Sequence, residues 1–237
     1  MTIGSVIGEA WTLYTRFFGR FFLLGLVVFA ALNLVYALLV EAISSDAGGA
    51  VVTLGILGFA IAVIGTTWLE GAFVYAVQDA RDGSFDSTLG DVFARVSPAV
   101  FPLLVAGLLA GLGIALGFIL FVVPGLILLT IWAVIGPVIV LEGAAPLDSF
   151  GRSRALVRGH GWTVFAIVLI TGLLSAIASG ILQTVFSFLP RFFEILVGGT
   201  IAQAVVAPLM AIAIALTYFG LREAHGEPEP TAAPAET

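Results

Sequence analysis

Two glutamates at the ends of apolar runs are the residues best placed for chemistry. Glu70 and Glu142 each stand in the sequence Leu-Glu-Gly-Ala after a long hydrophobic stretch. A carboxylate within a membrane span is costly, so it faces a partner or a cavity. We favour a structural ion pair at these positions. The alternatives are an anionic lipid headgroup or substrate bound by arginines left free, and a proton-coupled or catalytic carboxylate.

The arginines that could pair with these glutamates lie between residues 137 and 162. Arg152, Arg154 and Arg158 form the one basic cluster of the sequence. Arg154 and Arg158 are four residues apart, on one helical stripe, and we predict that they face Glu142 or Glu70. The cluster could instead mark the cytoplasmic side or bind anionic lipid. Three arginines are fewer than the roughly four to eight of a typical lipid-recognition patch.

Three uncharged polar residues interrupt other apolar runs: Asn33, Gln183 and Gln203. Such side chains usually hydrogen-bond between helices, each contributing about 0.6–2 kcal/mol. A polar permeation path would require the three to converge. His160, beside Gly159 and Gly161, is expected to be solvated or to cap a helix.

Known catalytic and cofactor motifs are missing from the sequence. It has no cysteine and two histidines, which excludes thiol chemistry and leaves little material for a metal site. It also lacks nucleotide-binding loops, HExxH, GxSxG and paired hydrolytic acids. We therefore predict no catalytic, cofactor-binding or metal-binding residues and no enzymatic activity, with an intramembrane enzyme as the least favoured alternative. The net charge of −6 and the membrane class exclude nucleic-acid binding.

Composition determines the fold class. Of 237 residues, 60% are hydrophobic and 10% are charged, against roughly 25% charged in soluble domains. Continuous apolar runs near or above about 18 residues predict membrane helices. We predict an all-α, polytopic bundle of six transmembrane helices in one domain, residues 1–225, followed by a disordered cytoplasmic tail, 226–237. The predicted spans are 21–42, 50–77, 99–121, 126–142, 162–187 and 195–220, with a kink at Pro137.

Arginine counts predict the orientation. With six spans, eight of the nine arginines fall on one side, and Arg191 alone falls on the other. The positive-inside rule then places both termini in the cytoplasm of a multi-pass cell-membrane protein. Arginine and aromatic residues recur before the first, third and fifth spans, near Gly8, Gly90 and Asp148. This repeat predicts three hairpins, each preceded by a cytoplasmic interfacial elbow helix.

A short motif around the elbow of the third hairpin resembles a known family. The match is to the membrane domain associated with glycerophosphoryl diester phosphodiesterases and its stand-alone, uncharacterised relatives. The residues that carry it are Pro137, Glu142, Ala145, Ser149, Arg152, Ser153, Leu156, Gly159, Trp162 and Phe165, with Tyr218, Leu221 and Arg222 in the last span. The resemblance implies a six-helix membrane protein. It does not imply the phosphodiesterase activity, which belongs to a separate soluble barrel domain in that family.

We expect a structural, interaction or lipid-associated role in the cytoplasmic membrane. The alternative is a transporter or channel for a small or lipidic substrate through the bundle. The expected partners are membrane lipids, with a membrane-protein partner or a homo-oligomer also open.

Overall fold

The computed structural model describes residues 2–45, 48–81, 83 and 87–228, and these residues form helices and turns without a strand. Most of the predicted disordered tail therefore lies outside the described residues. Six segments are long and apolar enough to cross a membrane. They are α2 (Phe18–Ser44), α3 (Gly48–Arg81), α4 (Leu89–Leu120), α5 with α6 (Val122–Ile131 and Ile135–Glu142), α8 (Gly161–Phe186), and the run of α9 (Arg191–Phe193), η1 (Glu194–Gly199) and α10 (Thr200–Ala224). The all-α class and the six apolar helices are confirmed, and they indicate a multi-pass membrane protein.

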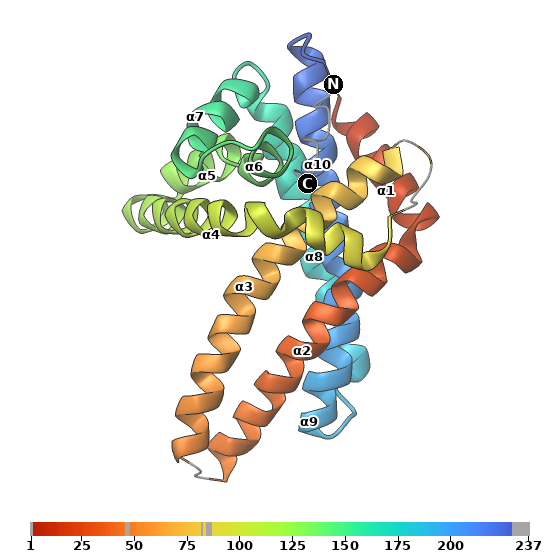
Figure 1. Ribbon diagram of the computed structural model, residues 1–237, viewed down its shortest axis with the longest axis vertical. Coiled ribbons are helices and arrows are strands. Elements are labelled where there is room, and N and C mark those ends of the chain that lie inside the picture. The colour runs from red at the N-terminus through yellow and green to blue at the C-terminus, as the bar shows by residue number, and fades with distance from the viewer. Residues whose placement is uncertain (1, 46–47, 82, 84–86, 229–237) are drawn as a thin grey trace.

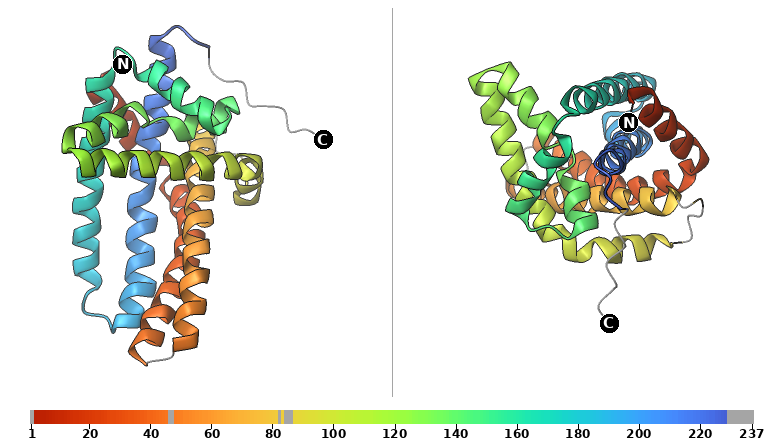
Figure 2. Two further views of the ribbon diagram at one scale, coloured as in Figure 1. Left: turned by 90° about the vertical axis from the view of Figure 1, so that its left-hand side faces the viewer. Right: turned by 90° about the horizontal axis from the view of Figure 1, so that it is seen from above.

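Four of the long helices run along the long axis of the molecule, and α4 lies across them. Figure 1 shows α2, α3 and α10 extending downward, and Figure 2 shows α8 parallel to α10. Both figures show α4 roughly perpendicular to this group, and the hairpin of α4 and α5 projects sideways from it. The 26 residues of α8 span about 39 Å at 1.5 Å per residue, enough to cross the apolar core of a bilayer.

The prediction of three hairpins with elbow helices is not confirmed. Short helices do precede two of the spans: α1 (Ile3–Arg16) comes before α2, and α7 (Pro146–Val157) comes before α8. Before the third span, however, α4 is continuous from Leu89, where the side chains of Thr88 and Asp91 cap its first turn reciprocally. The transverse position of α4 and α5 also breaks the expected threefold pattern.

The predicted kink at Pro137 is present as a break between α5 and α6. Proline lacks an N–H and clashes with the carbonyl four residues earlier, here that of Ala133. The helix accordingly opens at residues 132–134. The buried Ser153 hydroxyl of α7 donates to the Ile131 carbonyl at 2.8 Å, so the break is filled from outside the helix. Beside it, the rings of Trp132 and Phe150 pack edge to face at 4.9 Å.

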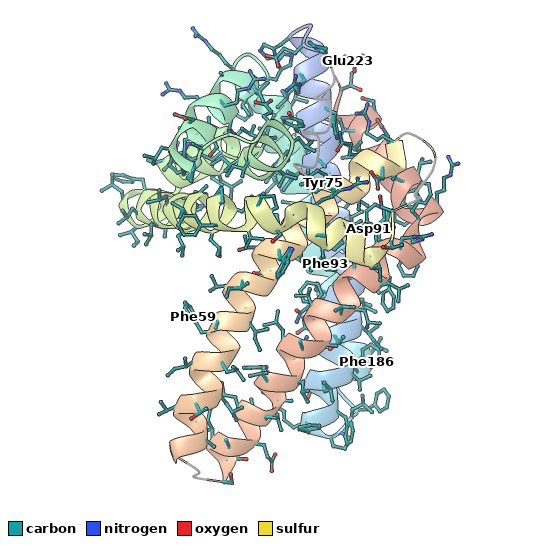
Figure 3. The ribbon with its side chains drawn as sticks, viewed as in Figure 1. Phe59, Tyr75, Asp91, Phe93, Phe186 and Glu223 are labelled. Carbon is teal, nitrogen blue, oxygen red and sulfur yellow. The ribbon has the colours of Figure 1, made fainter. Side chains whose placement is uncertain are left out.

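The buried core lies at one end of the molecule, which we call the arginine-rich end because Arg81, Arg152 and Arg222 contact other elements there. The last turns of α3, from Gly71 onward, are mostly buried against α4, α6 and α10. The first half of α3 instead exposes large apolar side chains, such as Phe59, which is 70% exposed and points away from the bundle in Figure 3. An apolar surface of this kind suits contact with lipid chains rather than water.

Candidate functional site

Glu142 is the centre of an ionic cluster at the arginine-rich end. It is the last residue of α6, which ends because Gly143 adopts a left-handed backbone with φ of +66°. Arg152 of α7 contacts both of its carboxylate oxygens, with Nε 2.8 Å from Oε2 and Nη2 3.0 Å from Oε1. This two-point geometry is the strong form of an arginine–carboxylate pair.

The last turns of α10 complete the coordination of Glu142. The Arg222 Nη1 lies 2.6 Å from Glu142 Oε1, and the Tyr218 hydroxyl donates to the same oxygen at 2.8 Å. Tyr218 is fully buried. The residues that bind this one carboxylate therefore come from two helices. One of these residues, Arg222, lies 80 positions after Glu142 in the chain.

Glu227, just beyond α10, brings a second carboxylate to the cluster. It accepts hydrogen bonds from both Nη atoms of Arg152, one of them at 2.9 Å, and the Arg222 Nη2 donates to the Pro228 carbonyl at 2.7 Å. The hydrogen bond from Arg152 lowers the pKa of Glu227, and the same bonds raise the pKa of Arg152. Two arginines and two glutamates give a net charge of zero.

The predicted partners of Glu142 need correction. Arg154 and Arg158 are exposed, and within the described ranges neither side chain forms an ion pair or hydrogen bond. The face of α7 that packs inward carries Ser149 and Ser153, both fully buried. At 100° per residue, Arg152 borders this face while Arg154 and Arg158 point further away from it.

Glu70 does not join the cluster. Its carboxylate lies beside Gly136 of α6, so close that a Cβ on that glycine would come 2.5 Å from Oε1. Across the part of the chain that the structure describes, the Glu70 side chain has no hydrogen bond or ion pair, and the residue is exposed. The predicted pairing of Glu70 with Arg154 or Arg158 is thus also not observed.

The three polar residues within the spans do converge. Asn33, Gln183 and Gln203 line one cavity of about 250 Å³ between α2, α8 and α10. The Gln203 amide is 3.5 Å from Asn33 Oδ1, and Asn33 itself donates to the Phe29 carbonyl at 2.8 Å. The cavity is bordered by η1, a π-helix, which is a rare element often found at functional sites.

The Glu142 cluster links α6, α7 and α10 through ion pairs, and we call it the latch. Both oxygens of Glu142 are engaged by donors, so the carboxylate has little freedom to act as a base or to hold a metal. Sequence reasoning identified Glu142 and Arg152 but missed Tyr218, Arg222 and Glu227 as partners. Tyr218 and Arg222 are four residues apart on one helical face near the end of the last span, which was the available signal.

In comparisons with known proteins, no family model, curated protein or solved structure matches the chain. The resemblance to the membrane domain of the phosphodiesterase family therefore stays a prediction.

Two arginines on α7 provide a matched test of the latch. Arg152→Gln should lower the free energy of unfolding by about 1–3 kcal/mol, because it leaves Glu142 and Glu227 without their shared donor. Arg154→Gln removes the same charge two positions away and should change it by less than about 0.5 kcal/mol. Thermal unfolding of both variants in one detergent measures this. Equal losses would contradict the latch.

The lowered pKa of Glu227 predicts a pH dependence. A carboxylate with a depressed folded-state pKa stabilises the fold above its ordinary pKa, about 4.5, and that stabilisation is lost as pH falls through the folded value. The stability advantage of the wild type over Glu227→Gln should be constant from pH 7 to about pH 5 and vanish in stronger acid. Unfolding temperatures of both proteins across this range test it. An advantage that persists unchanged after acidification would refute the bond to Arg152.

Proposed function

We propose that the protein is a lipid-associated structural protein of the cytoplasmic membrane, with its α4–α5 hairpin lying in the plane of the cytoplasmic leaflet. The observation that carries the proposal is the transverse hairpin, which has no charged residue beyond Arg95. Its partners would be the lipids of that leaflet.

The surface of the hairpin supports lipid contact. No charged residue occurs between Arg95 and Glu142. Large apolar side chains are exposed along both arms and around the tip, and Ile119 reaches 80% exposure. Moving one such side chain from water into an apolar phase stabilises by about 1.5–3 kcal/mol. A helix that is apolar on all sides belongs in a protein core or in lipid.

The position of the hairpin supports a location in one leaflet. It leaves the bundle close to α6 and α7, at the arginine-rich end, rather than running beside α2 and α8 (Figures 1 and 2). The arginine distribution favours the cytoplasm for that end. This orientation does not depend on whether the hairpin crosses the membrane. In either case the start of α4 and the end of α6 lie on the same side.

The absence of cysteine makes the orientation of α4 directly measurable. Spin labels at Leu108→Cys, Leu112→Cys and Ile119→Cys, on one face of α4, should lie at similar membrane depths. On α8, Ile170→Cys, Leu174→Cys and Ile181→Cys repeat the same spacing and should differ in depth by about 16 Å from first to last. Oxygen and nickel-chelate accessibilities in electron paramagnetic resonance report these depths. An equal gradient on both helices would show that α4 crosses the membrane.

Transport or binding of a small polar solute is the second candidate function. The convergence of Asn33, Gln183 and Gln203 favours it, as does an adjoining cavity of about 360 Å³ that shares Asn33 and Gln203. Arg191 and Glu194 also line the first cavity and give it charged groups at the end opposite the arginine-rich end.

Thiol labelling tests whether this cavity opens to water. Gln203→Cys should react with a membrane-impermeant thiol reagent added from the side of Arg191, and Ile212→Cys, which replaces a fully buried side chain of the same helix, should not. If Gln203→Cys is as unreactive as Ile212→Cys, the cavity is closed and solute binding is refuted.

A further inference from the structure

A groove of about 600 Å³ lies between α5 and the start of α8, next to the hairpin but separate from the Glu142 cluster. Its α5 wall consists mostly of apolar side chains, among them Leu126, Ile127 and Ile131, with Thr130 as the one polar residue. The facing wall carries Trp162 and Phe165, whose rings meet edge to face at 5.9 Å. Trp162 is 85% exposed, as expected for an aromatic residue at a membrane interface.

One end of the groove is polar. Gly159, His160 and Gly161 line it there, where α8 begins. No side chain caps α8, so the free N–H groups of its first turn and the positive end of its dipole are available to an anion. The Nδ1 atom of His160 is buried and has no hydrogen-bond partner within the described chain. A buried polar atom of this kind normally has a partner.

Two arginines lie close to this end in the sequence. Arg158 directly precedes the groove-lining turn, and its exposed side chain forms no ion pair with the described residues. The exposed Arg154 lies one helical turn earlier on α7 and is likewise unpaired there. The residues that line the groove include no acid. These two arginines are the members of the basic cluster that the Glu142 latch does not use.

We propose that this groove binds an anionic phospholipid, with an acyl chain between α5 and α8 and the phosphate at the first turn of α8 beside Arg158. The apolar walls match the chain, and the uncapped helix end and the nearby arginines match the phosphate. A zwitterionic headgroup would bring its own cation to the same positive site. The proposal rests on the lipid-associated function proposed above and names the lipid.

Trp162 reports on the occupant. The protein is reconstituted into vesicles of phosphatidylcholine and phosphatidylglycerol in which either the phosphatidylglycerol or an equal amount of phosphatidylcholine carries brominated chains, which quench tryptophan fluorescence. The Trp162 contribution is the signal lost in Trp162→Phe. Trp11→Phe is the control, because Trp11 is 59% exposed on α1 and is absent from the groove.

Brominated phosphatidylglycerol should quench the Trp162 contribution at a mole fraction about fivefold lower than brominated phosphatidylcholine requires. This is the enrichment expected from one arginine at a membrane surface. The Trp11 contribution should show no such preference. Arg158→Gln should remove most of the preference, and Arg191→Gln, which removes the same charge at the opposite end, should preserve it. Added inorganic phosphate should leave the quenching unchanged, since the acyl chain contributes to binding.

Equal quenching of Trp162 by both lipids, or a preference that survives Arg158→Gln, would overturn the anionic site while leaving the lipid-associated function intact. Displacement by inorganic phosphate would overturn the lipid as occupant. The lipid-associated function itself fails on a different result, a depth gradient along α4.

Discussion

The need to neutralise one carboxylate at the end of an apolar helix shapes the arginine-rich end of the molecule. Glu142 follows a long uncharged stretch, and a charge in such a place is costly unless it is paired. Arg152, Arg222 and Tyr218 satisfy it with contacts between 2.6 and 3.0 Å. Because these donors come from α7 and α10, the pairing joins the end of the hairpin segment to the last helix of the chain.

The contacts around this pairing also hold the hairpin in its position. Pro137 opens the helix between α5 and α6, and Ser153 of α7 fills the opening by donating to the Ile131 carbonyl. Trp132 and Phe150 pack beside it. Helix α7 therefore contacts both sides of the break while Arg152 holds the end of α6. Toward the opposite end, large apolar side chains on the outer surface, such as Phe59 and Ile56, suit a lipid environment.

Much of the fold followed from the sequence, because hydropathy and length determine which segments can cross a membrane. The direction of a helix is a different matter. An apolar helix in the plane of a leaflet and one that crosses the bilayer can have the same composition. Hydropathy therefore could not predict the transverse position of α4.

The candidate site was predictable only in part. Glu142 and Arg152 stood out because charges are rare next to apolar runs. Their pairing was missed because it depends on which face of α7 packs inward, and that is decided by Ser149 and Ser153 in the tertiary structure. Arg222 lies 80 positions from Glu142, and a single sequence carries no signal that joins residues so far apart. The convergence of Asn33, Gln183 and Gln203 likewise depends on helix packing.

A double-mutant cycle between Glu142 and Arg222 tests the central claim most directly. The free energies of unfolding of Glu142→Gln, Arg222→Gln and the double variant would be measured in one detergent. A direct contact that joins α6 to α10 predicts a coupling energy of about 1–3 kcal/mol. If the two single-variant losses sum to the loss in the double variant within about 0.5 kcal/mol, the direct contact is contradicted, because residues that do not interact have additive effects.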